Sequence, residues 1–107
     1  MDILDYLKFG TARFVKLDRA EINGLVVSTV FATDTRQYET AILDKNTTIP
    51  VERYPSESEA KSGHDKWIKW ASECKDGDKV MLVGIKDVYS ENEKDRLVEV
   101  RLGYSER

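Results

Sequence analysis

The sequence predicts an α+β domain with two layers: a mostly antiparallel sheet of about five or six strands, one long helix packed on it, and a short N-terminal helix. Three observations lead to this expectation. Segments rich in β-branched and aromatic residues, joined by short turns, fill residues 12–54; one amphipathic segment follows at about 57–75; and two more strand-like segments come after it. Strands joined by short turns pair antiparallel, and a lone amphipathic helix buries its apolar side against them. The 107 residues suit a single domain spanning 1–107.

The first half of the chain contains the clearest turn signal. Residues 2–8 form the predicted N-terminal helix, and residues 12–22 and 25–32 are predicted strands that flank Asn23-Gly24. Asparagine followed by glycine is the preferred pair in a two-residue type I′ turn, because both positions need a positive φ angle. The pair therefore predicts a β-hairpin.

Two further turns precede the long helix. Residues 33–36 lead into a predicted strand at 37–43, and residues 44–48 lead into a shorter one at 49–54. Pro50 lacks a backbone N–H, so the shorter strand is expected at the edge of the sheet or to begin at this proline.

The long helix carries recognisable signals at both ends. Ser56 and Glu59 form an S-x-x-E capping box, in which each side chain is expected to satisfy a free N–H group. The helix is expected to end near Lys75, with Gly77 in the left-handed conformation after the last turn.

The last two strands are predicted at residues 79–89 and 96–104, joined by the polar loop 90–95. Apolar and charged residues alternate in the second of them. The alternation assigns to one face Val98, Val100, Leu102 and Tyr104.

The only histidine, His64, lies on the apolar side of the long helix. The same side carries, at spacings of three and four, Ala60, Trp67, Ala71 and Cys74. One interpretation of His64 is a buried neutral imidazole that is hydrogen-bonded to the backbone of a strand or loop. The other is a base or ligand-binding group in a cleft between helix and sheet.

Three neighbours of His64 have simple structural interpretations. Gly63 in mid-helix costs about 1 kcal/mol relative to alanine, which indicates close approach of another backbone or of a bulky ring. Trp70 lies at the margin of the apolar side, so partial exposure would make it a contact for a partner. Cys74 is expected to be a small core residue.

Composition argues against several function classes. The formal net charge is −3 and no basic stripe occurs, so we expect no nucleic-acid binding. A single cysteine rules out an intrachain disulfide and a cysteine-rich zinc site. No segment approaches the roughly 20 apolar residues of a membrane span and the N-terminus lacks the pattern of a signal peptide, so we expect a cytoplasmic protein without membrane contact.

Sequence frames for catalysis are also missing. No G-x-S-x-G, G-x-G-x-x-G or Walker motif occurs, so neither a catalytic serine frame nor a nucleotide cofactor is expected. No metal is expected either, because the one histidine lies ten residues from Cys74 and carboxylates would have to supply most of the three or four usual ligands. Glu39, Asp44 and Glu52 could converge near one end of the sheet, but charges that flank turns are usually solvated.

Residues 38–70, which include YETAILDKN and IPVERYPSESEAKSGHDKWIKW, resemble a segment of small uncharacterised proteins of tailed bacteriophages and prophages. In that segment a strand with Glu-Thr precedes Glu-Arg-Tyr, an acidic turn with Glu-Ala, then Gly-His and an aromatic residue. The matching residues are Glu39, Thr40, Glu52, Arg53, Tyr54, Glu59, Ala60, Gly63, His64 and Trp67. The resemblance implies a phage or prophage origin and brings no activity with it.

The leading hypothesis is a non-enzymatic phage or prophage accessory protein that acts in the host cytoplasm by binding a host factor or a component of a defence system. The candidate partner or cleft residues are His64, Trp70, Tyr54, Glu39 and Arg53. Exposed strand edges also allow pairing with a second copy. Two alternatives stay open: a minor virion or assembly component, and a small enzyme or ligand-binding protein that uses His64 with nearby carboxylates.

Overall fold

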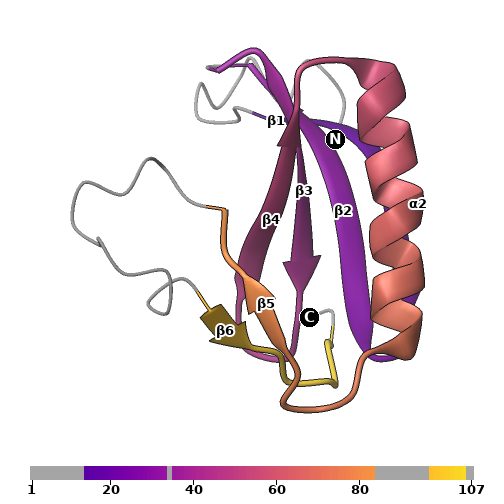
Figure 1. Ribbon diagram of the computed structural model, residues 1–107, viewed down its shortest axis with the longest axis vertical. Coiled ribbons are helices and arrows are strands. Elements are labelled where there is room, and N and C mark those ends of the chain that lie inside the picture. The colour runs from indigo at the N-terminus through magenta and orange to yellow at the C-terminus, as the bar shows by residue number, and fades with distance from the viewer. Residues whose placement is uncertain (1–13, 34, 84–96, 106–107) are drawn as a thin grey trace, which may run out of the picture.

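The computed structural model describes residues 14–33, 35–83 and 97–105. Four consecutive strands form an antiparallel sheet in the order β1-β2-β3-β4, and a second pair of strands forms its own small sheet. The long helix lies along one face of the larger sheet, and the small sheet lies at the end where the helix finishes (Figure 1). The elements are β1 (Phe14–Ile22), β2 (Leu25–Ala32), β3 (Gln37–Leu43), β4 (Thr48–Tyr54), α2 (Glu57–Glu73), β5 (Lys79–Met81) and β6 (Leu97–Glu99).

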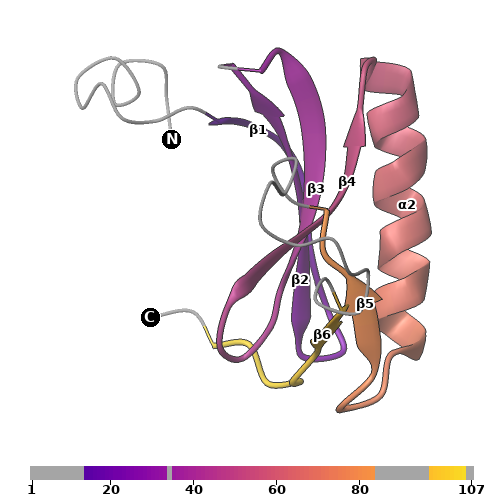
Figure 2. The ribbon, with the colours of Figure 1, turned by 60° about the vertical axis from the view of Figure 1, so that its left-hand side comes forward.

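The predicted α+β architecture is confirmed, with helix and sheet as separate layers (Figure 2). The strands differ from the expectation in one respect, because the six described strands form two sheets of four and two. The predicted short helix at residues 2–8 lies outside the described residues.

The β1–β2 hairpin has the predicted turn and a further role. Asn23 and Gly24 have φ angles of 56° and 73°, as a type I′ turn requires. The Asn23 Nδ2 group also donates to the backbone oxygens of Ala71 at 2.9 Å and Cys74 at 2.7 Å. These are carbonyls at the end of α2, where the last residues lack the usual helical N–H partners. The Ala71 carbonyl also accepts the Cys74 N–H at 3.2 Å. One side chain therefore shapes the hairpin turn and caps the helix.

Strand register places three rows of side chains across the helix-facing side of the sheet, because directly opposed residues share a face. We call them the aromatic row, the polar row and the aliphatic row. The aromatic row is Val15, Phe31, Tyr38 and Tyr54; the polar row is Asp18, Thr29, Thr40 and Glu52; the aliphatic row is Ala20, Val27, Ile42 and Ile49.

The main core lies between the aliphatic row and the second half of α2. The helix contributes Ala71 and Cys74 to this core. Val80 of β5 and Val100, the residue directly after β6, also belong to it. The apolar side predicted for the helix is confirmed, since all four of its non-tryptophan members are buried: Ala60, His64, Ala71 and Cys74.

Pro50 lies in β4, an edge strand of the sheet, as its missing N–H predicted. The pairing with β3 shifts at Thr40/Ala41, so Val51 is the extra residue of a bulge. The Pro50 carbonyl accepts a hydrogen bond from the backbone N–H of Val83 at 2.8 Å. The chain that follows β5 therefore contacts this edge beside the proline.

The two helix ends depart from the expected hydrogen bonds. The Glu59 N–H donates to Ser56 Oγ at 3.3 Å, as predicted, but the Glu59 carboxylate accepts from the Ser56 hydroxyl at 3.1 Å. The helix ends at Glu73, before Lys75, because Cys74 is already extended. Gly77, with φ of 91°, serves the turn between α2 and β5 instead of the helix end.

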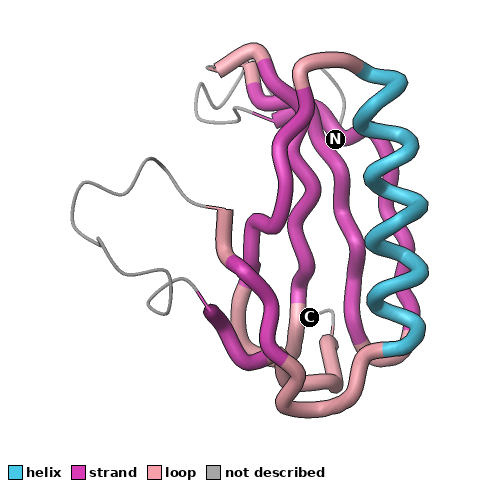
Figure 3. Tube along the Cα trace, in the orientation of Figure 1, coloured by secondary structure: helices cyan, strands magenta, loops and turns pink. Residues whose placement is uncertain are grey.

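The described part of the last two predicted strands contains less strand than expected, and residues 84–96 lie outside the described residues. Described strand structure covers only Lys79–Met81 and Leu97–Glu99. Beyond β6 the backbone bonds to turns: Leu102 N–H donates to Asp76 Oδ1, and the N–H groups of Gly103 and Tyr104 both donate to the Gly24 carbonyl. The β1–β2 and β3–β4 turns, the end of the helix and the C-terminal segment thus meet at one end of the molecule (Figure 3).

Asn23→Gly is expected to lower the free energy of unfolding by about 1–2 kcal/mol, because glycine keeps the positive φ but loses both bonds to helix carbonyls. Asn23→Ala should cost about 1 kcal/mol more, since it also strains the turn. Chemical denaturation measures both, with Asn46→Gly as the control in another turn. Wild-type stability of Asn23→Gly would contradict the capping role.

Candidate functional site

The polar row and α2 form a buried hydrogen-bond network around His64. The His64 side chain is about 2% exposed, and its Nδ1 lies 2.6 Å from Thr29 Oγ1. Thr29 Oγ1 lies 2.6 Å from Thr40 Oγ1 on the neighbouring strand. The histidine therefore ties the helix to the middle strands through side-chain hydroxyls, where a bond to backbone was expected.

The second ring nitrogen of His64 faces the edge strand β1. Nε2 has no hydrogen-bond partner among the described residues, and Asp18 Oδ2 lies 3.7 Å away. This carboxylate favours the tautomer with the proton on Nε2. The Thr29 hydroxyl then donates to His64 Nδ1 and accepts from the Thr40 hydroxyl, so each threonine hydroxyl donates one hydrogen bond toward the histidine ring.

Glu52 collects the other hydrogen bonds of the polar row. Its Oε1 accepts from Tyr54 Oη at 2.8 Å and Trp67 Nε1 at 2.9 Å, and Lys66 Nζ lies 2.6 Å away. Burial by itself would raise the pKa of Glu52, but these three hydrogen bonds and the charge of Lys66 outweigh it and hold the pKa below its usual value. Glu52 is thus an ionised hydrogen-bond acceptor that joins β4 to the helix.

Tyr54 explains the glycine in mid-helix. A Cβ atom on Gly63 would overlap the ring and hydroxyl of Tyr54. The close approach of a bulky ring, one of the two expectations for Gly63, is therefore confirmed. Burial, reinforced by the neighbouring charge of Glu52, raises the pKa of Tyr54 to about 12, so the phenol stays protonated and donates.

Glu39 and Arg53 form a pair apart from the His64 network. They are direct cross-strand partners, with Arg53 Nε 2.9 Å from Glu39 Oε2. Both follow the alternation of their strands onto the sheet face that turns away from α2, since the neighbouring Thr40 and Glu52 face the helix.

The three carboxylates considered for a catalytic group do not converge. Glu52 faces the helix and Glu39 the opposite side of the sheet. Asp44 lies in the β3–β4 turn, where it accepts the backbone N–H groups of Asn46, Thr47 and Arg101. The possible convergence therefore does not occur, because strand alternation separates the first two carboxylates and the turn uses the third.

The candidate Trp70 packs against the core, and Cys74 is a core residue as expected. Trp70 is half-buried, and its ring packs edge-on against Trp67 with centroids 5.5 Å apart. Cys74 is buried, and burial together with the charge of Asp78 raises the pKa of its thiol to about 11, so it lacks the thiolate of a nucleophile.

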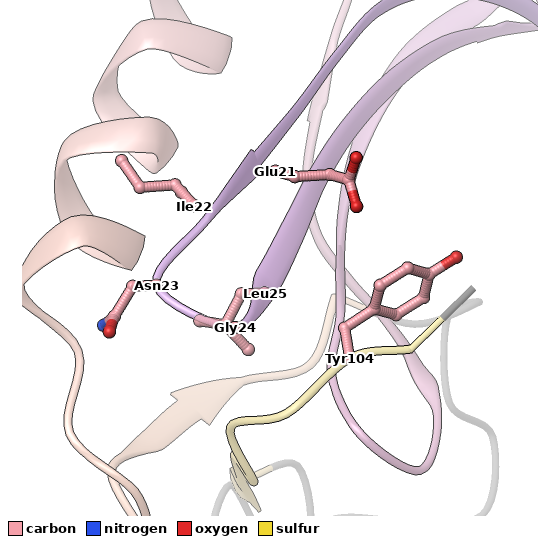
Figure 4. Close-up of a pocket in the computed structure, with 6 residues that line it drawn as sticks. All are labelled: Glu21, Ile22, Asn23, Gly24, Leu25 and Tyr104. Atoms are coloured by element: carbon pink, nitrogen blue, oxygen red, sulfur yellow. The ribbon is translucent and has the colours of Figure 1, made fainter.

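Concave features of the described surface are shallow. One hollow of about 210 Å³ lies between the β1–β2 turn and Tyr104, and Glu21 and Tyr104 lie beside its opening while Asn23 points toward the helix end (Figure 4). A more open groove of about 460 Å³ runs where β4 meets the start of α2, and includes Arg53 and Tyr54. The hollow has two titratable groups in its lining, Glu21 and Tyr104. The groove gathers more of them around Glu52, whose Oε1 is already engaged by Tyr54 and Lys66.

The described residues hold no group of three or more His, Cys, Asp or Glu side chains that could bind a metal ion. In the same part of the chain, no helix has the length and apolar character needed to cross a membrane.

Sequence reasoning missed the exposed apolar residues. Val15, Met81 and Leu97 are 52%, 41% and 43% exposed. The alternation of residues in β1 does not predict the side on which Val15 lies, because a register shift between Lys16 and Asp18 moves the pairing of the strand by one residue. Cross-strand register, which the sequence leaves open, was needed to see that Met81 and Leu97 are neighbours.

Comparison with known proteins adds no assignment: no protein-family model matches the chain, and no curated protein and no solved structure is similar to it.

His64→Ala is expected to lower the free energy of unfolding by about 2–4 kcal/mol, because it leaves a cavity and removes the acceptor of Thr29. Thr29→Val removes the same bond with little change in volume. In denaturant titrations, the loss of unfolding free energy in the double variant should be smaller than the sum of the two single losses by about 0.5–3 kcal/mol. Simple additivity would mean that the 2.6 Å contact carries no coupling.

Glu52→Gln is expected to destabilise the protein at pH 7 and to lose this effect in acid. The folded state lowers the Glu52 pKa below its ordinary value of 4.5, so the contribution is present above about that pH and fades as pH falls through the folded value. Unfolding curves of wild type and variant from pH 7 to 3 should converge. Glu73→Gln, on the exposed side of α2, is the control, and a gap that stays constant with pH would contradict the assignment.

Proposed function

We propose that this chain is a non-enzymatic protein-binding module of a tailed bacteriophage or prophage and that it binds a host protein through the exposed end of the aromatic row. Val15, Phe31 and Tyr38 form this surface, which we call the aromatic ledge. It lies at the end of the sheet where α2 begins.

The observation that carries the proposal is the change in exposure along the aromatic row. Tyr54 is 7% exposed beneath Gly63, whereas Val15 at the other end of the row is 52% exposed. Between them Phe31 and Tyr38 are half-buried, with ring centroids 4.9 Å apart. Aromatic side chains held in place by neighbours and partly open to solvent are typical centres of protein–protein binding.

The groups that could do chemistry favour binding over catalysis. His64 is 1% exposed, so a substrate would have to displace the helix to reach it. Glu52 is engaged by three donors, and the Cys74 thiol is protonated and buried. These side chains are explained by the contact between helix and sheet.

The phage origin rests on the resemblance of residues 38–70. Most of the shared positions lie in the contacts described above: Thr40, Glu52, Tyr54, Gly63, His64 and Trp67. A segment kept for packing would be shared among proteins that bind different partners, which fits an accessory family without a common activity.

Affinity capture from lysate of the host, with wild type and with Val15→Glu, tests the proposal. A charge on the ledge should abolish capture of the host protein, because it would be desolvated in the complex. Leu97→Glu, an equal change at another exposed apolar residue, should leave capture intact. Circular dichroism checks that all three proteins are folded.

Capture that survives Val15→Glu would place the contact elsewhere and contradict the role of the ledge. Recovery of the protein in purified virions, with no host partner, would instead favour the assembly component considered above.

A further inference from the structure

We infer that the outer face of the β5–β6 sheet is an interface between two copies of this chain. The face consists of Lys79, Met81, Leu97 and Glu99, and it lies at the opposite end of the molecule from the aromatic ledge (Figure 1). The inference therefore goes beyond the proposed function and does not depend on it.

Strand alternation separates this face from the core. Val80 is 5% exposed and packs into the core cluster, and its partner Val98 packs against the same cluster. Their neighbours along each strand point outward: Met81 and Leu97, which are register partners, are 41% and 43% exposed. Two large apolar side chains thus lie side by side on the surface.

The charges on the face are arranged to fit a second copy. Lys79 lies directly opposite Glu99, in the row next to Met81 and Leu97. Consider two such faces packed against each other about a two-fold axis that runs parallel to the strands, between β5 and β6. This rotation places Lys79 of each copy over the partner's Glu99, and Met81 over the partner's Leu97.

The other in-plane two-fold axis, perpendicular to the strands, would place charged residues over apolar ones. Burying a charge against an apolar group is costly, so the pattern selects the axis parallel to the strands. The face is therefore self-complementary in one orientation, as an isologous interface requires.

A hydrogen bond within the chain holds Glu99 in position. Arg101 Nη2 lies 2.5 Å from Glu99 Oε2, and Arg101 Nη1 lies 3.3 Å from Asp76 Oδ2. A carboxylate can accept about four hydrogen bonds, so Glu99 keeps acceptor capacity for the partner's Lys79. Less side-chain freedom remains to be lost when the second copy binds.

The size of the face sets the strength of the contact. Four residues of each copy bury much less than the roughly 800 Å² per partner of a stable complex. We therefore expect a weak dimer that forms at high protein concentration and weakens with added salt.

Analytical ultracentrifugation of the full chain, from micromolar to millimolar concentration, tests the inference. The average mass should rise from 12.3 kDa toward twice that value as concentration increases. Lys79→Glu and Glu99→Lys should each remain monomeric, because each would place two like-charged pairs in a symmetric dimer.

An equimolar mixture of Lys79→Glu and Glu99→Lys should associate again. In the mixed dimer the glutamate introduced in one copy would face the lysine introduced in the other, and the unchanged Glu99 and Lys79 would face each other, so both contacts become attractive. Lys69→Glu, an equal charge change on the exposed side of α2, should dimerise like wild type, and so should Val15→Glu on the ledge.

A wild-type protein that stays monomeric at millimolar concentration, or a mixture of the two folded variants that does not associate, overturns the inference. Because Val15→Glu and the β5–β6 variants affect different ends of the molecule, loss of the host partner and loss of the dimer are separable results.

Discussion

The polar row across the helix-facing side of the sheet is the constraint on which the rest of the structure depends. A sheet face that packs on a helix is normally apolar, and each unsatisfied polar group there costs about 1–3 kcal/mol. This one carries Asp18, Thr29, Thr40 and Glu52 in adjacent strands. The helix must therefore present hydrogen-bonding groups at positions along its axis that lie opposite this row, and it does so with His64 and Trp67.

This matching fixes the helix along its axis and in its distance from the sheet. Moving α2 by one turn, about 5.4 Å, would separate His64 from Thr29 and Trp67 from Glu52 at the same time. Gly63 allows the helix to come close enough for those bonds, because the Tyr54 ring fills the space where a side chain would stand. An apolar interface could slide with little penalty, whereas this one would lose its hydrogen bonds to Thr29 and Glu52 in any other position.

The sequence is informative where a local rule decides the outcome. The Asn23-Gly24 turn, the Ser56 start of the helix and the edge position of Pro50 each depend on one or two residues and were predicted correctly. The apolar side of α2 was equally visible, because its period is a property of the helix itself.

What sequence could not supply depends on contacts between distant residues. The helix ends at Glu73 where Asn23, about 50 residues earlier in the chain, caps it, and the segment after β6 leaves its strand to bond with Asp76 and Gly24. The same holds for the candidate site. Burial was one of two interpretations of His64 that the sequence allowed, and its threonine partners follow from strand register, which two bulges shift.

The type I′ turn has a consequence for how this protein can change. Hairpin tips are usually where chains accept insertions, because they project into solvent. Here Asn23 donates to the end of the helix, while the Gly24 carbonyl accepts two N–H groups from the C-terminal segment. A single extra residue at this tip would detach both, so peptide tags and fused domains belong elsewhere, and length variation in relatives of this fold should avoid this turn.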